Sequence, residues 1–291
     1  MNPGIIFAVF TILLFGSWAV PTKGLRIDPK VQAFWLTVGH FFLSLLVYLL
    51  LFRPVSVGVF FVPFVAGVFW ALGITAGFVG IRQLGMTRAV GIWIPVVILV
   101  SALWGLLFFR EAWEMSWVTL MLTFASLALL ISAAWMVILS AKGEEKLGNV
   151  KIGILASLVL GVLHGSFFVP LRTSALPIFI TFFPLTLGMV MTTSCTAVLQ
   201  RLQIRYDLFS TLRMILAGLI LGVGNYTALL TIQFLGVAHG YPLTQLGIVV
   251  NTLWGALVFK ELTTSKGKLF VGIGVVVAIL GAMLLNFART R

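Results

Sequence analysis

The sequence predicts an all-α membrane protein with ten transmembrane helices arranged as two inverted five-helix repeats. Composition is the first observation: 61% of the 291 residues are hydrophobic and only 9% are charged, whereas soluble domains carry roughly 25% charged residues. The second observation is that the apolar residues gather in ten long runs. The third is that short motifs recur in the two halves of the chain. A chain with these properties must be surrounded by lipid.

Each of the ten apolar runs is long enough to cross a bilayer, which takes about 20 predominantly apolar residues in a helix. The runs cover residues 4–22, 31–52, 57–80, 89–109, 115–139, 152–170, 176–199, 212–232, 237–259 and 268–287. They are continuously apolar, so they predict helices rather than the alternating strands of a β-barrel. No lysine or arginine precedes the first run, so we expect a retained first helix rather than a cleaved signal peptide.

Basic residues predict how the spans are oriented. Fourteen of the 19 lysines and arginines follow spans one, three, five, seven and nine, among them Lys23 and Arg88. Because positively charged loops stay in the cytoplasm, we expect these loops inside and both termini outside, in a multi-pass protein of the plasma membrane. The net charge of +12 does not indicate nucleic-acid binding, because the basic residues are scattered between the apolar runs.

Motifs recur between the two halves of the chain at nearly constant spacing. Residues 16–23 (GSWAVPTK) match 165–172 (GSFFVPLR), Leu84-Gly85 matches Leu235-Gly236, Leu103-Trp104-Gly105 matches Leu253-Trp254-Gly255, and Arg110-Glu111 matches Lys260-Glu261. Each half holds five spans, an odd number, so equivalent helices must cross the membrane in opposite directions. We predict a first repeat over residues 1–139, a cytoplasmic connection over 140–151 and a second repeat over 152–291, with a binding site near the midplane between the repeats.

Several stretches of the sequence carry a family resemblance. They are residues 67–73 (GVFWALG), 84–88 (LGMTR), 236–238 (GVA), 242–255 (PLTQLGIVVNTLWG) and the pair Gly224-Asn225. These stretches, with the ten-span repeat, resemble the drug/metabolite transporter superfamily and, within it, the glucose/ribose porter family of sugar uptake proteins. The resemblance implies a secondary transporter that works by alternating access on a sugar or a similar small neutral polar metabolite. The sequence departs from such relatives at His239, Tyr241, Trp93 and Pro95.

Polar side chains inside the spans are costly in lipid and usually face the interior of the helix bundle. Spans three, four, eight and nine are equivalent pairs in the two repeats, so we expect their polar residues to converge on one cavity. The candidates for substrate binding are Trp70, Trp93, Asn225, Tyr226, Thr244, Gln245 and Asn251. Amide side chains both donate to and accept from a hydroxylated ligand, and tryptophan stacks on the apolar face of a sugar. The competing interpretation of each amide is an interhelical hydrogen bond.

No acidic residue lies in the middle of a predicted span. The chain therefore lacks the carboxylate relay of many proton-coupled antiporters, which argues against an efflux pump for cationic drugs. For coupling to protons His164 is the candidate relay, because histidine titrates near neutral pH, and His40 has the same standing. A packed neutral histidine, in a facilitator that needs no coupling ion, is the alternative.

The matching Gly-Ser and proline blocks predict two gates, one at each membrane surface. The gate residues are Gly16, Ser17, Pro21 and Lys23 in the first repeat and Gly165, Ser166, Pro170 and Arg172 in the second. Small residues allow helices to approach closely, and proline weakens the helix end. The alternative is an ordinary helix end followed by a cation that extends to the membrane surface.

The sequence holds no metal-ligand cluster, phosphate-binding glycine loop or nucleophile with a base, so we expect neither an enzyme nor a cofactor. The expected partners are a small-molecule substrate and the lipid bilayer, with no nucleic acid. Small-xxx-small spacings such as Gly218…Gly222 fit both a monomer and a homodimer. Two further functions stay open: an exporter of amino acids or related metabolites on the same fold, and a lipid-handling or non-transporting membrane protein.

Overall fold

The computed structural model describes residues 3–51, 57–108, 115–140, 148–167, 169–170, 178–244 and 246–289. Every regular element in these ranges is a helix, which confirms the predicted all-α class. Eight helices are long and apolar enough to cross a bilayer: Pro3–Thr22, Pro29–Leu50, Val59–Leu84, Met86–Phe108, Trp117–Leu139, Phe179–Leu199, Leu208–Thr231 and Ser265–Leu284. Two further predicted spans contain shorter apolar helices, Val150–Ser166 and Gly247–Val258.

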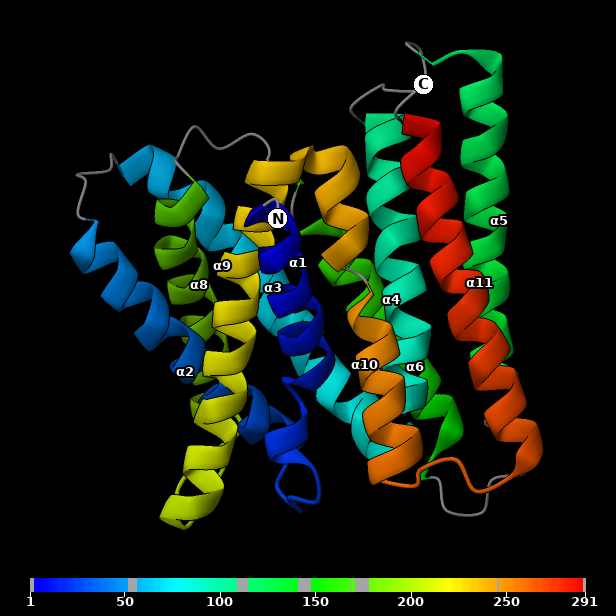
Figure 1. Cartoon of the computed structure of the whole chain (residues 1–291). Helices are drawn as coiled ribbons and strands as arrows, with labels where there is room; N and C mark the ends of the chain where they lie inside the picture. The colour runs from blue at the N-terminus through cyan, green and yellow to red at the C-terminus, as the bar shows by residue number, and fades with distance from the viewer. Residues whose placement is uncertain are drawn as a thin grey trace.

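The helices follow one another along the chain as labelled in Figure 1. They are α1 (Pro3–Ser17), α2 (Pro29–Leu50), α3 (Val57–Leu84), α4 (Met86–Leu103), α5 (Trp117–Leu139), α6 (Val150–Ser166), α8 (Ile178–Leu199), α9 (Leu208–Thr244), α10 (Gly247–Leu253) and α11 (Ser265–Arg289). A 3-10 turn, η1 (Val20–Thr22), follows α1. Two π-helical turns, η2 (Trp104–Phe108) and η4 (Trp254–Val258), extend α4 and α10. Such turns often occur at functional sites.

Local signals explain several helix ends. Asp28 Oδ1 accepts a hydrogen bond from the Lys30 N–H at 2.8 Å where α2 begins, and such caps satisfy N–H groups that have no acceptor within the helix. Asn149 Oδ1 caps α6 by accepting from the Ile152 N–H at 3.1 Å. Gly85 joins α3 to α4 with a φ of 81°, a conformation that favours glycine.

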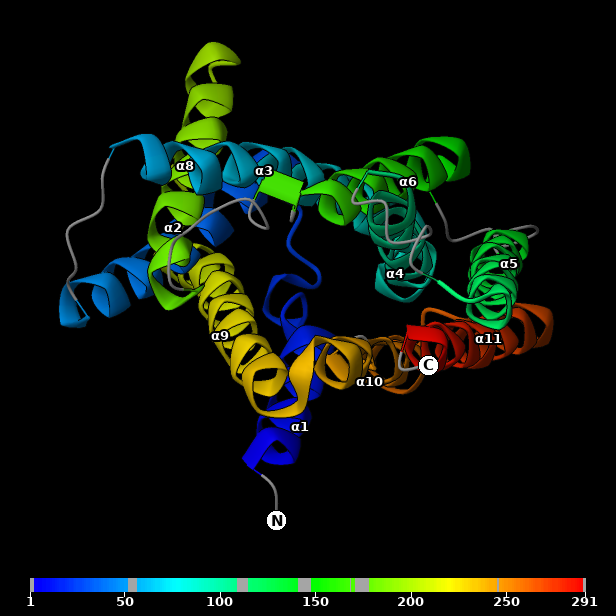
Figure 2. The ribbon, with the colours of Figure 1, turned by 90° about the horizontal axis from the view of Figure 1, so that it is seen from above.

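The predicted connection between spans eight and nine is wrong in position. The sequence predicts a break over residues 233–236, but α9 stays helical from Leu208 to Thr244, and the chain leaves the helix only before α10 begins at Gly247. Residues 233–236 (QFLG) hold no proline, and Gly236 does not end the helix, whereas Pro242, which lacks a backbone N–H, lies two residues before the end of α9. The figures show α9 bending at its gold end to reach α10 (Figures 1 and 2).

Helices from both halves of the chain interleave. α1 packs against α9 and α10, α3 against α6 and α8, α2 against α8 and α9, and α5 pairs with α11 at one side of the molecule (Figure 2). Glycines bring some of these helices into backbone contact. At the crossing of α3 and α8, a Cβ atom on Gly67 or on Gly188 would lie under 3.0 Å from a backbone carbonyl of the other helix. The same holds for Gly39 and Gly218 at the crossing of α2 and α9.

Candidate functional site

A group of aromatic and imidazole rings lies between the two halves of the chain. Trp70 of α3 stacks on His164 of α6 with ring centroids 4.9 Å apart, and His40 of α2 meets Trp70 edge-on at 5.8 Å. His164 Nε2 also lies 3.0 Å from the Trp70 carbonyl oxygen. Gly73, one turn beyond Trp70, leaves the space for the His164 ring, because a Cβ there would lie under 3.0 Å from it. The structure thus brings Trp70 and His164 together.

Asn225 and Tyr226 join this group from α9. Asn225 Nδ2 lies 3.4 Å from His40 Nε2, while Tyr226 reaches the group through Phe182, whose ring lies 4.9 Å from the tyrosine and 6.2 Å from His40. His40 Nδ1 and the Tyr226 hydroxyl are buried and have no hydrogen-bond partner within the described chain. Buried polar groups are normally paired, so these two atoms are exceptions within the described chain.

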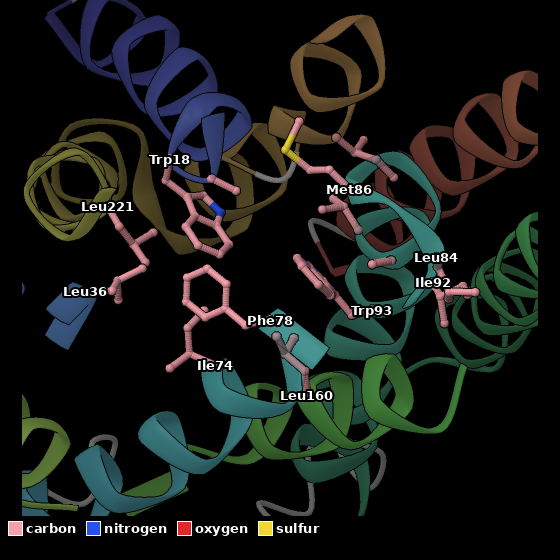
Figure 3. Packing of buried hydrophobic residues seen from close by; sticks show 14 of the residues in the cluster. Trp18, Leu36, Ile74, Phe78, Leu84, Met86, Ile92, Trp93, Leu160 and Leu221 are labelled. Atoms are coloured by element: carbon pink, nitrogen blue, oxygen red, sulfur yellow. The ribbon is translucent and has the colours of Figure 1, made fainter. Parts of the chain in front are cut away.

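Trp93 lies on α4, beside an aromatic ring just after α1 and another on α3. Trp18 and Phe78 meet edge to face with centroids 5.6 Å apart, and Trp93 faces them from α4 (Figure 3). All three side chains belong to the same buried cluster as Trp70. The predicted pair Trp70 and Trp93 therefore shares one hydrophobic centre, to which Trp18 contributes a third indole that the sequence analysis did not select.

The remaining predicted binding residues lie around the break between α9 and α10. Thr244 is the last residue of α9 and Asn251 lies within α10, and both are buried. Asn251 Oδ1 has no hydrogen-bond partner in the described chain. Gln245 lies outside the described residues. The structure does not join Asn251 to the His40–Trp70 rings by a hydrogen bond or a ring contact.

The predicted gate blocks lie where helices of different halves touch. A Cβ atom on Gly16 would lie under 3.0 Å from Val250 of α10, and one on Gly165 under 3.0 Å from Val100 of α4. The serines that follow accept hydrogen bonds from indoles. Ser17 Oγ accepts from Trp254 Nε1 and Ser166 Oγ accepts from Trp104 Nε1, both at 2.8 Å. Each serine thus ties its helix to a π-helical turn.

One end of the molecule is closed by an ion pair. Lys23 Nζ pairs with the carboxylate of Glu261 and lies 5.1 Å from the centre of the Phe259 ring. The same carboxylate accepts from the backbone N–H groups of Met86 at 3.0 Å and Thr87 at 2.8 Å, so it caps α4. Burial alone would raise the pKa of Glu261, but Lys23 and these N–H groups outweigh burial and hold the pKa below its ordinary value.

Two arginines complete this end of the molecule. Arg213 of α9 donates to the backbone oxygens of Pro21 and Lys23, each at 2.7 Å. Arg88 is fully buried in the first turn of α4 and donates to Ser140 Oγ at 3.2 Å and to the Glu261 backbone oxygen at 3.4 Å. The apolar runs place Arg88 in a loop after span three, which is wrong because α4 begins at Met86.

At the other predicted gate only part of the block is described. Gly165 and Ser166 end α6, Pro170 lies in a short helical stretch, and Arg172 lies outside the described residues. The sequence did not single out Glu261 or Arg213, which contact Lys23 and Pro21 in the structure. The Lys260-Glu261 repeat motif was the only signal for Glu261, and Arg213 gave none beyond its position after an odd-numbered span.

Comparison with known proteins assigns the chain to a family. The sequence model of the family described as sugar transport protein matches residues 6–288. The chain belongs to this sugar transport protein family. This family member is 27% identical to the glucose uptake protein GlcU of Bacillus subtilis, over 99% of both chains. It is 25% identical to a protein of Bacillus anthracis and 24% identical to one of Listeria innocua, both named for sugar uptake, over 98% of this chain and 99% of theirs.

A solved structure shares the fold of this sugar transport protein. A crystal structure superposes with a TM-score of 0.58 at 16% sequence identity, covering all of this chain and 99% of the other. At this level of identity the likeness concerns the fold alone. Together with the apolar helices, the family supports a multi-pass protein of the plasma membrane that transports a small molecule.

Proposed function

We propose that this sugar transport protein takes up a sugar or a similar small neutral polar metabolite by alternating access. The observation that carries the proposal is the family match over residues 6–288, supported by relatives named for sugar uptake along their whole length. The candidate site fits such a cargo. Its side chains are aromatic rings, an amide, a phenol and imidazoles, which supply apolar faces and neutral hydrogen-bonding groups.

The chain forms ten spans as two inverted five-helix repeats in this proposal. Paired contacts between the halves support it. Thr37 bonds Thr193 at 2.8 Å, and Ser44 bonds Thr186. Thr186 and Thr193 stand 149 residues after Thr37 and Ser44, so an exchange of the two halves converts one bond into the other. A two-fold axis between α2 and α8 has this effect.

Within two further sets, the contacts are also converted into each other when the two halves of the chain are exchanged. The Ser17–Trp254 bond corresponds to Ser166–Trp104, and both tryptophans begin π-helical turns. The close approach of Gly73 to His164 corresponds to that of Gly224 to Phe15. In Figure 1, α1 descends while α6 ascends, as inversion requires of equivalent helices. The two shorter helices, α6 and α10, complete the ten spans in this reading.

The ion pair of Lys23 and Glu261 forms the closed gate of an alternating-access cycle. It holds the end of α1 and the loop before α11 against the first turn of α4, and therefore joins the two halves at the surface that the positive-inside rule places in the cytoplasm. Opening requires this pair to separate and an equivalent closure to form at the opposite surface. The structure then corresponds to a state closed toward the cytoplasm.

The rival functions lack comparable support. An exporter of amino acids needs groups that bind a carboxylate and an ammonium group. Among the described residues, the group around His40, Trp70, Asn225 and Tyr226 supplies no carboxylate, lysine or arginine. A lipid-handling protein does not require the buried, unpaired Tyr226 hydroxyl and His40 Nδ1. Neither function is named among the relatives described above.

Uptake by the purified protein in liposomes tests this function. We expect saturable entry of radiolabelled glucose or a related sugar, with a KM raised about tenfold by Asn225→Ala or Tyr226→Phe, because each removes one buried polar group from the site. Gln200→Ala, at the exposed end of α8, is the matched control and leaves KM unchanged. Flux of amino acids without flux of any sugar would replace this proposal with the exporter.

A further inference from the structure

The tryptophans of the described chain differ in what their indole N–H groups bind. Those of Trp35, Trp104 and Trp254 donate to Ile204 O, Ser166 Oγ and Ser17 Oγ at 3.0, 2.8 and 2.8 Å. Trp117 and Trp135 are 81% and 61% exposed. Trp18, Trp70 and Trp93 are at least 94% buried, and their indoles make no hydrogen bond within the described part of the chain.

The indole N–H groups of these three residues lie in one cluster and have no acceptor within the described chain, although the N–H of a buried tryptophan usually finds one. All three residues belong to the central hydrophobic cluster, and the ring group that includes Trp70 also holds the buried, unpaired Tyr226 hydroxyl and His40 Nδ1. A polar ligand between the halves would satisfy these groups.

The faces of these indoles are not equally available. His164 covers one face of Trp70 at a centroid distance of 4.9 Å and an interplanar angle of 20°, and His40 meets the same ring edge-on. No ring stacks in parallel on Trp18 or Trp93 in the described chain, and the ring partner of Trp18 is Phe78 at an angle of 85°. Stacking on a ligand therefore falls to Trp18 and Trp93 rather than to Trp70.

Trp18, Phe78 and Trp93 converge from three helices. Trp18 follows the end of α1, Phe78 lies on α3 two turns beyond Trp70, and Trp93 lies on α4 (Figure 3). In the figure the Trp93 ring stands roughly edge-on to the viewer and faces the other two rings. The three residues lie toward the end of the molecule that the Lys23–Glu261 pair closes, since Lys23 follows Trp18 by five residues.

We propose that Trp18, Phe78 and Trp93 form a stacking site that selects a sugar in its cyclic pyranose form. A pyranose presents a face of C–H groups, which packs on an aromatic ring, and a rim of hydroxyl groups, which accept from N–H donors such as the two free indole N–H groups. An open-chain polyol such as D-glucitol offers hydroxyl groups but has no such flat face. This inference rests on the proposed sugar uptake and adds which form of sugar is taken.

Competition and mutation in liposomes test this stacking site. We expect unlabelled D-glucose to inhibit uptake of labelled glucose at a concentration at least about tenfold lower than D-glucitol requires, because the ring contributes one aromatic stacking contact. Trp18→Ala and Trp93→Ala raise KM about tenfold, while Trp18→Phe and Trp93→Phe raise it less because they keep an aromatic face. Trp135→Ala, on the exposed surface of α5, leaves KM unchanged.

Fluorescence provides a readout that does not depend on transport. Addition of D-glucose to the detergent-solubilised wild-type protein changes its tryptophan emission, and the change is lost in the Trp18→Phe/Trp93→Phe double variant but kept in Trp35→Phe. Equal inhibition by D-glucitol, or unchanged KM and emission in the Trp18 and Trp93 variants, overturns the stacking site while sugar uptake stands. A wild-type protein that transports no sugar at all overturns the proposed function instead.

Discussion

Glu261 connects the segments that meet at one end of the molecule, namely η1, the start of α4 and the loop before α11. Its carboxylate pairs with Lys23 at the end of η1 and accepts from two backbone N–H groups at the start of α4. The side chain is only 8% exposed, so loss of the pair leaves a charge with little water around it. Breaking a buried ion pair by removing one partner costs about 3 kcal/mol or more.

We expect Glu261→Gln to lower the melting temperature of the purified protein at neutral pH and to flatten its dependence on acid pH. The pKa of Glu261 is held below its ordinary value. A carboxyl of this kind contributes stability above its unfolded pKa, and that contribution is lost as the pH falls through the lowered folded pKa. Melting curves between neutral pH and pH about 3 measure both effects, and the fall of the wild-type curve in this range should shrink in the variant.

A matched pair of lysines serves as the control for this prediction. Lys23 and Lys266 each lie over a phenylalanine ring, at 5.1 and 5.8 Å from its centre. Only Lys23 has a carboxylate partner in the described chain. Lys23→Gln should therefore destabilise the protein and Lys266→Gln should not. Equal effects of the two substitutions would show that the ring contact, and not the ion pair, matters.

At the level of single residues, side-chain chemistry alone narrows the candidates, and their roles in binding stay predictions. Trp70, His164, Asn225 and Tyr226 stand out as polar or amphipathic groups inside apolar spans, and the structure gathers them. Glu261 was not selected as the partner of Lys23, because 238 residues separate the two. Nothing in a single sequence reports a contact of that range unless the fold is already known.

Among the helices, close packing depends on glycine at a few crossings. A Cβ atom on Gly188 or Gly67 would meet the backbone between α3 and α8, and one on Gly39 or Gly218 would meet it between α2 and α9. These contacts are with carbonyl groups, which do not move aside as a flexible side chain does. The helices must then separate to admit even a methyl group.

We expect Gly188→Ala to destabilise the protein by roughly 1–3 kcal/mol, the usual cost of overpacking a filled interior. Gly272→Ala is the control, since nothing lies within 4 Å of a Cβ atom there although the residue also sits in an apolar helix, α11. Thermal unfolding in detergent measures both. If the two variants have the same melting temperature, the close approach of α3 and α8 is not required for stability.

The elements were predictable as far as hydrophobicity defines them. Long apolar runs mark the helices, and the eight candidate spans overlap the predicted runs. The end of α9 was not predictable in this way, because residues 233–236 and the residues around Pro242 both mix apolar and polar side chains. The π-helical turns η2 and η4 also left no sign in composition, although the shared Trp-Gly at their starts marked them as equivalent.

At the scale of the whole molecule, the proposed cycle requires the closed end to open. We expect a short bismaleimide that links cysteines at positions 23 and 261, in a Cys195→Ser background, to abolish sugar uptake into liposomes. A monofunctional maleimide on the same variant, which modifies both cysteines without joining them, should leave more activity than the cross-linker. Full transport by the cross-linked protein would show that this end stays closed throughout the cycle and is no gate.

The two serine–tryptophan bonds have a mechanical consequence. Ser17–Trp254 fastens α1 to the lower extension of α10, and Ser166–Trp104 fastens α6 to the extension of α4, and both bonds exist in the same state. Each fastened pair takes one helix from either half of the chain. In the proposed alternating-access cycle, each rigid body would therefore contain helices from both sides of residues 140–151. The proposed repeat and the proposed moving body are then two different groupings of the same helices.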